Sequence, residues 1–399
     1  MQRSLDLDIA RQDTCNVITA RAGVPEAFRL ACESAPPAYE VCLVERLFDE
    51  NAALLASLLA DRRSLFITTP TVNRLHGDRL RGALAAGRYD ATVEVIACDE
   101  VNKTMEKVVE ICGRAQNCGL GRKDVLVSFG GGVCSDLVTV AASLVRRGIS
   151  HVRIPTTLIG QVDAAIGIKG GVNFSSKKNY LGCYHPPEQV LIDPEFLTSL
   201  PKVHLSAGCA EIIKMAIIAD RGLFDEVWEH GPTLMETGFA EPFAVSRAVV
   251  WRTCKLMLDN LLLNFYEDRS YERYVDFGHT FSPLLEAISQ YLIPHGQAVA
   301  IDIALSSAIS CEMGLLTVVD FESILQILER VNLPIAHPGL TVGSCLEAIQ
   351  DATCHRGGRP NLAVPTSIGS VTFIRDTEDL PANLLRAAMV RIAAYAEAV

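Results

Sequence analysis

The apolar positions in the first half of the chain form two alternating kinds of run. Short continuous apolar runs predict buried strands, and longer runs with apolar residues three and four positions apart predict helices. The predicted strands are residues 64–69, 92–97, 124–128 and 151–154, and the predicted helices are residues 50–60, 102–118 and 136–147, with a turn at Pro70. Strands that alternate with helices in this order predict a parallel α/β sheet.

Helical spacing dominates the chain after about residue 195. The predicted helices here are residues 205–219, 242–263, 279–291, 296–313 and 320–331, and a strand pair is predicted within 362–375. We therefore predict an α/β domain over residues 1–195 and a mainly α-helical domain over residues 196–399. A functional site is expected in the cleft between them, because ligand sites favour domain interfaces.

Composition narrows the class of protein. Apolar residues make up 49% of the 399 residues, so the chain can bury a large core. A net charge of −11 argues against binding to nucleic acid or to a membrane surface. The 13 cysteines are odd in number and lack paired CxxC spacing, which is typical of reduced thiols. With no signal-peptide pattern and no apolar run of ~18 residues, the sequence predicts a soluble cytoplasmic protein.

A glycine triplet at residues 130–132 follows an apolar run and opens a predicted helix. Glycine lets the backbone approach a pyrophosphate, and the start of a helix offers unpaired N–H groups. The triplet is not the usual G-x-G-x-x-G fingerprint, and by itself it is equally compatible with a tight turn. Thr156 and Thr157 follow the next predicted strand and could add hydroxyl groups. Together these features predict a Rossmann-like dinucleotide site.

Three lysines lie within ten residues at Lys169, Lys177 and Lys178. The surrounding segment is rich in Gly, Ser and Asn, which predicts a loop. Such a loop can wrap around a ligand, and lysine supplies a point charge suited to phosphate. The alternative is a solvated charged loop without a ligand.

One carboxylate and two imidazoles are available as metal ligands, at Glu211, His279 and His295. Two histidines and one glutamate form a set typical of a catalytic Zn²⁺ with an open position for substrate. Lys214 shares a helical face with Glu211. The alternatives are a surface ion pair for Glu211 and Lys214, and structural roles for the histidines. The histidines are 16 positions apart, so metal binding depends on the fold.

Taken together, these segments resemble the sugar phosphate cyclases, the superfamily of dehydroquinate synthase. The resemblance runs from about residue 64 to about residue 375 and rests on many motifs in the same order. These motifs are Gly-Gly-Gly-Val-x-x-Asp, Pro-Thr-Thr-Leu, Gln-Val-Asp, Lys-x-x-Val-Asn, Lys-Asn, His-x-Pro, Ala-Glu-Ile-Ile-Lys, Phe-Gly-His-Thr and His-Gly-x-Ala-Val-Ala.

The resemblance implies a dehydroquinate synthase-like fold, a homodimer and a full set of site residues. Zn²⁺, or Co²⁺ in its place, would be held by Glu211, His279 and His295. NAD⁺ would be contacted by Glu100, Lys103, Gly131, Gly132, Val133, Cys134, Asp136, Thr156, Thr157, Lys178 and Phe196. The catalytic and substrate site would be lined by Asp163, Lys169, Asn179, Lys214, Lys255 and Asp276.

The chain departs from the dehydroquinate synthases at several positions. Asp276 replaces a usual Asn, Glu272 replaces a usual Arg, Pro283 replaces a second His, and Gly-Ile-Lys-Gly at 167–170 replaces Gly-Gly-Lys-Thr. Two acids in place of Arg and Asn should repel a substrate carboxylate, whereas a neutral polyol can donate hydrogen bonds to Asp276. This reasoning favours a neutral ketose phosphate as substrate.

With Gly-Ile-Lys-Gly-Gly-Val-Asn and Lys-Lys-Asn-Tyr-Leu-Gly, the chain looks most like the sedoheptulose 7-phosphate cyclases. That resemblance implies a lyase that uses NAD and Zn to cyclise sedoheptulose 7-phosphate, with loss of phosphate, to a C7 cyclitol. The product favoured is 2-epi-5-epi-valiolone. Formation of 2-epi-valiolone or desmethyl-4-deoxygadusol is the alternative within this group.

Three other functions stay open at this point. The first is 3-dehydroquinate synthesis, the second is an iron-dependent alcohol or glycerol dehydrogenase, and the third is a binding or regulatory homologue without activity. The lysine-rich segment favours a cyclase over a dehydrogenase, because a simple alcohol needs no cationic groups. The expected partner is therefore a small sugar phosphate, with no nucleic acid and no membrane.

Overall fold

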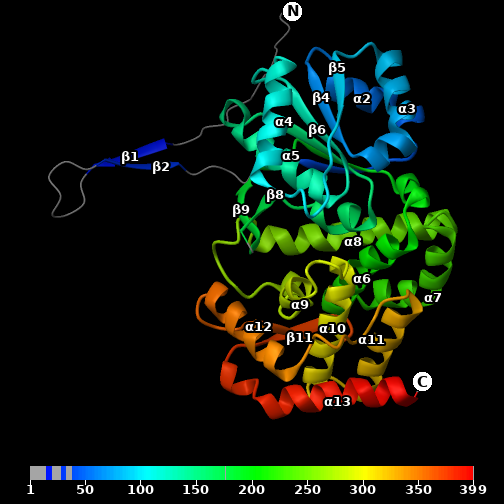
Figure 1. Ribbon diagram of the computed structural model, residues 1–399, viewed down its shortest axis with the longest axis vertical. Coiled ribbons are helices and arrows are strands. Elements are labelled where there is room, and N and C mark those ends of the chain that lie inside the picture. The colour runs from blue at the N-terminus through cyan, green and yellow to red at the C-terminus, as the bar shows by residue number, and fades with distance from the viewer. Residues whose placement is uncertain (1–14, 20–27, 33–37, 176, 399) are drawn as a thin grey trace, which may run out of the picture. The chain divides into compact units, whose positions relative to one another are not determined.

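The computed structural model describes residues 15–19, 28–32, 38–175 and 177–398, in two compact units, Met1–Tyr39 and Glu40–Val399. Within the first unit, β1 (Cys15–Thr19) pairs antiparallel with β2 (Phe28–Cys32). The later elements belong to the second unit, which holds all the residues predicted to act in the site (Figure 1).

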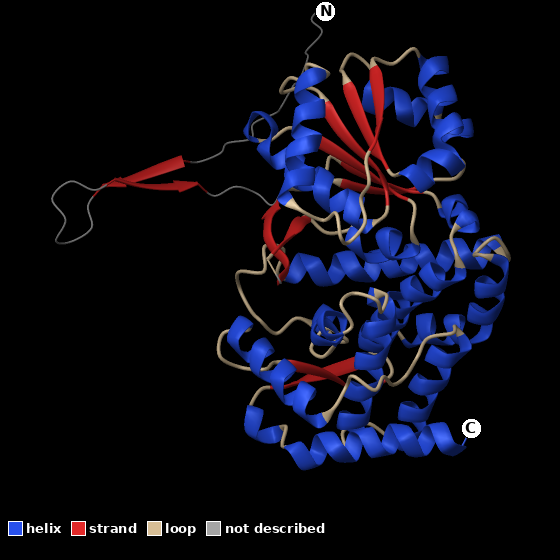
Figure 2. Ribbon diagram, in the orientation of Figure 1, coloured by secondary structure: helices blue, strands red, loops and turns tan. Residues whose placement is uncertain are grey.

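The second unit contains a six-stranded sheet in which all neighbouring strands are parallel (Figure 2). In spatial order the strands are β3 (Glu40–Leu43), β10 (Gln189–Ile192), β7 (Ser150–Pro155), β6 (Val125–Gly130), β4 (Ser64–Thr68) and β5 (Ala91–Val95). Along β4, Phe66 joins one buried cluster, whereas Leu65 and Ile67 join another. Because both faces are buried, β4 and β6 read as largely apolar runs. The predicted parallel α/β sheet is confirmed.

Helices cover both faces of this sheet. The cluster with Phe66 includes side chains of α1 (Leu47–Glu50), α2 (Ala52–Leu59) and α3 (Pro70–Gly87), and the other cluster includes side chains of α4 (Met105–Asn117) and α5 (Gly132–Leu144). Strand β6 ends one residue before Gly131, the N-cap of α5. The glycine turn therefore lies at the carboxyl end of the parallel strands, where ligands bind in such sheets.

The turn predicted at Pro70 is wrong. Pro70 is the first residue of α3, and the side chain of Thr69 caps this helix by accepting a hydrogen bond from the backbone N–H of Val72. Proline favours the first position of a helix, because its missing N–H would have no partner there. The same proline can therefore start a helix where the sequence was interpreted as a turn.

The loop predicted around the three lysines is also wrong. The segment forms an antiparallel hairpin of β8 (Lys169–Phe174) and β9 (Lys177–Tyr184). Its glycines serve close packing: a Cβ atom at Gly182 would lie 2.3 Å from the backbone oxygen of Gly170, and one at Gly170 would lie 2.7 Å from Thr139. Composition predicted a loop because glycine is typical of loops, but here it allows backbones to approach one another.

The rest of the unit is mainly helical, as predicted. Its helices are α6 (Lys202–Ala219), α7 (Arg221–Thr237), α8 (Phe243–Leu263), α9 (Ser282–Ile288), α10 (His295–Glu312), α11 (Val318–Arg330), α12 (Val342–His355) and α13 (Ala382–Ala398). The predicted strand pair is the hairpin of β11 (Leu362–Ser367) and β12 (Ser370–Ile374). Short helical turns are η1 (Val145–Arg147), η2 (Gly160–Ala164), η3 (Pro194–Ser199), η4 (Tyr274–Asp276) and η5 (Thr377–Asp379).

Helices α3, α7, α12 and α13 were not predicted, and the helix predicted from residue 279 begins only at Ser282. Pro232 lies inside α7, which weakens its helical signal. Among the described residues, no helix is long and apolar enough to span a membrane. The domain boundary at residues 195 and 196 stays a prediction.

Candidate metal and nucleotide site

Three elements bring the predicted metal ligands together. Glu211 is fully buried in the middle of α6, His295 is the first residue of α10, and His279 lies in the turn between η4 and α9. Glu211 Oε1 lies 3.7 Å from His279 Nε2 and 3.5 Å from His295 Nε2. One ligand atom from each residue lies within 4.8 Å of the other two, so the three can share one ion.

The donor atoms of this group suit a cation. Within the described part of the chain, Glu211 Oε1 is buried and has no hydrogen-bond partner. His279 Nδ1 lies 3.1 Å from the carbonyl oxygen of Phe277, and His295 Nδ1 lies 2.8 Å from Glu286 Oε1. Since both partners can only accept, each Nδ1 carries a proton, and each Nε2 is the atom left to bind a metal beside Glu211. A metal ion would satisfy the three donors at once.

The charges around Glu211 are strongly coupled. Burial works to raise the pKa of Glu211, but Lys214 and the two imidazoles lower it well below its usual value. Lys214 Nζ lies 2.6 Å from Glu211 Oε2, and although burial opposes its charge, Glu211 and Asp163 raise its pKa. Burial, followed by Lys214, lowers the pKa of His279 to about 3. Burial also acts to lower the pKa of His295, but the neighbouring carboxylates of Glu211 and Glu286 raise it to about 9.

Asp302 holds the turn that carries His279. Its Oδ2 accepts hydrogen bonds from the three backbone N–H groups of residues 280–282, at 2.8, 2.5 and 2.9 Å. Its Oδ1 accepts a hydrogen bond from Ser306 Oγ at 2.9 Å, and the side chain is buried. Asp302 is seven positions after His295 on α10. One helix therefore supplies one ligand and anchors the turn of another.

The two acids that were predicted to repel a carboxylate are both neutralised. Glu272 forms two contacts with Arg375, at 2.6 and 3.1 Å, and is exposed. Asp276 lies 2.7 Å from Arg273, and 3.8 Å from Arg356. These pairs weaken the predicted repulsion, which stays a prediction, because sequence comparison at single positions does not show the arginines that the fold brings alongside.

We predict that Glu272→Gln leaves both stability and substrate preference unchanged. The Glu272–Arg375 pair is solvent-exposed, and exposed pairs contribute little because water and salt screen them. The measurement is the rate of phosphate release from neutral and keto-acid sugar phosphates, together with the urea midpoint. A gain of activity on the keto-acid phosphate would show that Glu272 does select against a carboxylate.

The glycine turn packs tightly against the segment after β7. A Cβ atom at Gly131 would lie 3.1 Å from Thr157, and one at Gly132 would lie 3.0 Å from Ala164. The φ of Gly131 is −78°, so close approach and not backbone conformation requires glycine. Within the described residues, no side chain caps α5, which leaves its first N–H groups available to an anion.

Next to this turn, candidate residues from three segments form one hydrogen-bonded group. Lys103 is buried, lies 2.5 Å from Asp136 Oδ2 and donates to Asn179 Oδ1 at 2.6 Å. The backbone N–H of Asn179 donates to Asn173 Oδ1 at 3.0 Å, and Asn173 Nδ2 donates to Glu100 Oε1 at 2.9 Å. Lys103 precedes α4, which begins at residue 105, so Lys103 is not part of the helix as predicted.

Several other predicted cofactor residues are buried in the protein core. Cys134 and Thr156 are buried, and Thr156 donates its backbone N–H to Gly130. Phe196 is 1% exposed, and its ring centroid lies 5.4 Å from that of Phe129. Val133 and Thr157 remain partly exposed. Of these five residues, only Val133 and Thr157 can offer side-chain surface to a ligand without rearrangement.

The predicted substrate residues divide into two groups. The pKa of Asp163 is raised by burial and by Glu211, and lowered by Lys214, His295 and Lys169, which places these groups within electrostatic range of one another. Lys169 also pairs with Glu267, a residue that the sequence did not single out. Lys255, in contrast, is exposed on α8, and no ion pair within the described residues ties it to this group.

Comparison with known proteins decides the family. The 3-dehydroquinate synthase N-terminal model matches residues 93–207, and the 3-dehydroquinate synthase C-terminal model matches residues 208–353. A 2-epi-5-epi-valiolone synthase from Streptomyces glaucescens is 39% identical over 358 residues, which cover 89% of this chain and 91% of that protein. The chain belongs to the dehydroquinate synthase-like sugar phosphate cyclases.

Two further comparisons place this sugar phosphate cyclase within its family. The structure of ValA, a 2-epi-5-epi-valiolone synthase from Streptomyces hygroscopicus subsp. jinggangensis 5008 with NAD⁺ and Zn²⁺ bound, matches with a TM-score of 0.85 and 38% identity, and covers 90% of this chain and 98% of ValA. A 3-dehydroquinate synthase from Nostoc punctiforme is 29% identical over 350 residues, covering 87% of this chain and 95% of that protein.

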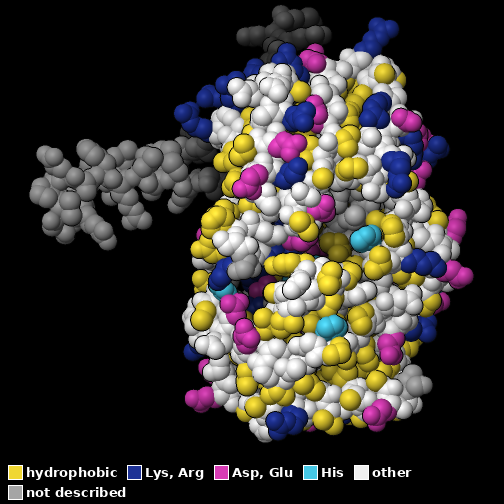
Figure 3. Space-filling view, viewed as in Figure 1, with side chains coloured by type: hydrophobic (Ala, Val, Ile, Leu, Met, Phe, Trp, Pro, Cys, Tyr) yellow, Lys and Arg dark blue, Asp and Glu magenta, His cyan; other side chains and the backbone are white. Residues whose placement is uncertain are grey.

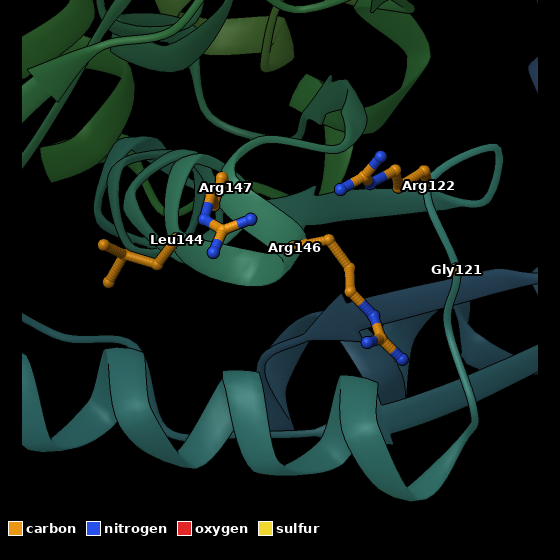
Figure 4. Close-up of a pocket in the computed structure, with 5 residues that line it drawn as sticks. All are labelled: Gly121, Arg122, Leu144, Arg146 and Arg147. Carbon is orange, nitrogen blue, oxygen red and sulfur yellow. The ribbon is translucent and has the colours of Figure 1, made fainter.

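A surface pocket of about 590 Å³ lies apart from the cyclase site residues. It is lined by Gly121, Arg122, Leu144, Arg146 and Arg147 (Figure 4). Figure 3 shows Lys and Arg side chains gathered along the upper left of the visible face. The pocket offers positive charge but no buried polar side chain, so its lining does not indicate a specific binding site.

Sequence reasoning missed Glu286, Asp302 and Arg273. Arg356 donates to the carbonyl oxygen of His279 at 3.1 Å and to Thr280 Oγ1 at 3.0 Å, so it supports the turn of a metal-ligand candidate. Each of these is a single charged residue outside a local motif. The one signal available was an acid inside an apolar helical run, as for Asp302 in α10.

Proposed function

We propose that this cyclase converts sedoheptulose 7-phosphate to a C7 cyclitol with loss of phosphate, and that the product is 2-epi-5-epi-valiolone. The observation that carries the proposal is the nearly full-length similarity to 2-epi-5-epi-valiolone synthases. The sequence identity is 39% to the synthase from Streptomyces glaucescens and 29% to the 3-dehydroquinate synthase from Nostoc punctiforme. The intact Glu211, His279 and His295 group supports a catalytic role.

In this proposal the metal is Zn²⁺, with Co²⁺ able to replace it, and its ligands are Glu211, His279 and His295. A bound metal would supply a Lewis acid that makes a substrate hydroxyl more acidic. Lys214 is 2% exposed and sits beside Glu211, so it supplies a fixed positive charge in a place that water barely reaches. A fixed charge of this kind stabilises negative charge that develops on substrate oxygens.

The charges suited to the departing phosphate come from the hairpin and its neighbours. Lys169 opens β8, and half of its side chain is exposed, so it can reach a ligand. Its present partner Glu267 would have to give way to a phosphate group. Asn179, on β9, accepts a hydrogen bond from Lys103. We assign Asp163, Asn179, Lys255 and Asp276 to the same substrate site.

NAD⁺ is assigned to the carboxyl edge of the sheet. The uncapped start of α5 would receive the pyrophosphate, and Val133 and Thr157 offer exposed surface beside it. Glu100, Lys103, Asp136 and Lys178 would complete the contacts. When bound, NAD⁺ supplies a reversible hydride acceptor. A homodimer and the division into domains 1–195 and 196–399 are retained as part of the proposal.

The product identity is tested by NMR on parallel reactions with two substrates. Purified enzyme with NAD⁺ and Zn²⁺ is incubated with sedoheptulose 7-phosphate and, separately, with the keto-acid phosphate used by 3-dehydroquinate synthases. We expect a C7 cyclitol from the heptulose phosphate only, with coupling constants that identify 2-epi-5-epi-valiolone. Turnover of the keto-acid phosphate alone would overturn the proposal, and the coupling constants of another cyclitol would replace the product.

A further inference from the structure

Glu286 joins two site side chains that come from distant parts of the sequence. Its Oε1 lies 2.8 Å from His295 Nδ1, and its Oε2 accepts a hydrogen bond from Lys178 Nζ at 2.5 Å. The Glu286 side chain is 5% exposed and belongs to α9, whereas Lys178 belongs to β9. The carboxylate therefore links the hairpin of β8 and β9 to the start of α10.

Both oxygens of Glu286 are engaged, and water has little access to replace either partner. Because a carboxylate can only accept, His295 must carry its proton on Nδ1. The Nε2 atom, which lies 3.5 Å from Glu211 Oε1, is then the ring nitrogen left to bind a metal. A carboxylate on the second nitrogen of a ligating histidine fixes the ring's orientation and tautomer and strengthens its binding to metal.

The other oxygen has a separate effect. Lys178 is partly exposed, with 26% of its side chain accessible, and a lysine side chain has many rotamers. Its bond to a buried, fixed carboxylate selects one direction for the ammonium group. This places the charge of Lys178 next to the His295 side of the site, although the two residues come from a sheet hairpin and from a helix.

We propose that Glu286 is a positioning residue that sets His295 for the metal and Lys178 for the nicotinamide cofactor. The inference rests on the proposed function for the metal ligands and for the cofactor contact of Lys178. It predicts that one side chain, which touches neither ligand directly, controls the affinity for both.

The test measures metal and cofactor binding without turnover. Zn²⁺ affinity is measured by competition with a chelator, Co²⁺ absorption spectra report the geometry of the ligands, and NAD⁺ affinity is measured on the Zn²⁺-loaded protein. The variants are Glu286→Ala, Glu286→Gln and Lys178→Met. Gln can still accept from His295 but turns an amide N–H₂ toward Lys178, so it separates the two halves of the role.

We expect Glu286→Ala to weaken Zn²⁺ binding by about 10- to 100-fold, the range for loss of such a carboxylate partner, and to change the Co²⁺ spectrum. Glu286→Gln should keep most of the Zn²⁺ affinity and weaken NAD⁺ binding. Lys178→Met is the matched control, because it should weaken NAD⁺ binding while Zn²⁺ affinity stays within a few-fold of the wild-type value. Unfolding midpoints of the metal-free proteins report any general loss of structure.

Unchanged Zn²⁺ affinity and an unchanged Co²⁺ spectrum in folded Glu286→Ala would overturn the role toward His295. Unchanged NAD⁺ affinity in both Glu286→Gln and Lys178→Met would overturn the role toward the cofactor. A wild-type protein that binds Zn²⁺ no better than His295→Ala would instead overturn the metal assignment in the proposed function, which keeps the two failures distinct.

Discussion

The Glu211→Gln variant is expected to lose metal and cyclase activity together. Glu211 is the one buried carboxylate of the ligand group, and its Oε1 makes no hydrogen bond that a glutamine could preserve in the described structure. Metal polarisation contributes several kcal/mol to the transition state, and each ~1.4 kcal/mol is tenfold in rate, so activity should fall by about a thousandfold or more. The measurements are metal content after dialysis and the rate of phosphate release.

His204→Ala is the matched control for this variant. His204 lies on the same helix, is exposed, and has no assigned role in the site. Its metal content and activity should equal those of the wild-type protein. Full activity of a Glu211→Gln protein that has been shown to be free of metal would contradict the metal assignment, whatever the product.

Among the substitutions proposed, Asp302→Ala is expected to give the largest loss in the free energy of unfolding. The substitution leaves the three buried N–H groups of residues 280–282 without their acceptor. Each unsatisfied buried donor costs about 1–3 kcal/mol, so the free energy of unfolding should fall by roughly 5 kcal/mol. Whole domains are stable by only about 5–15 kcal/mol, so this variant will be close to unfolding. Urea titration of the metal-free protein measures the loss.

Asp302→Asn and Ser306→Ala make the prediction testable even where Asp302→Ala does not fold. Asparagine retains one carbonyl oxygen as an acceptor, so the Asp302→Asn protein should be destabilised less than the Asp302→Ala protein. Ser306→Ala removes only one hydrogen bond to Asp302 and should change stability by about 1 kcal/mol. Because residues 280–282 follow His279 directly, Asp302→Asn should also weaken Zn²⁺ binding. A folded Asp302→Ala protein with an unchanged urea midpoint would contradict this role.

The parts of the fold that sequence could predict are those with a local signal. The buried strands of the sheet gave continuous apolar runs, and the turn before α5 combined a run of this kind with three glycines. The metal ligands Glu211, His279 and His295 were found because each lies in a motif that the resemblance covers. Their meeting within 4.8 Å, however, depends on three separate elements and could only come from the structure.

The errors concern residues whose usual local preference differs from the role they have in the folded protein. The glycines of β8 and β9 signalled a loop, yet they allow Gly170 and Gly182 to approach within a hairpin. Pro70 signalled a turn, yet it begins α3. Asp276 signalled excess negative charge, yet Arg273 and Arg356 lie beside it. Contacts between residues far apart in sequence leave no periodic or compositional pattern.

Glu286 and Asp302 show that residues of the candidate site can likewise lack any local pattern in the sequence. Both act on the metal ligands through hydrogen bonds to a side chain or a turn, and neither has a neighbouring residue that marks it as functional. The geometry, once available, separates them from the many exposed acids on the surface, because both are buried and both have all their oxygens paired.

The proposed function requires that this cyclase oxidises its substrate only transiently. The most direct measurement is the ratio of phosphate released to NADH accumulated when the enzyme, with NAD⁺ and Zn²⁺, is given sedoheptulose 7-phosphate. We predict many molecules of phosphate per enzyme, with no net NADH, because a hydride accepted by bound NAD⁺ would be returned before product leaves. NADH accumulating in step with substrate consumed, without phosphate, would contradict the claim and indicate a dehydrogenase.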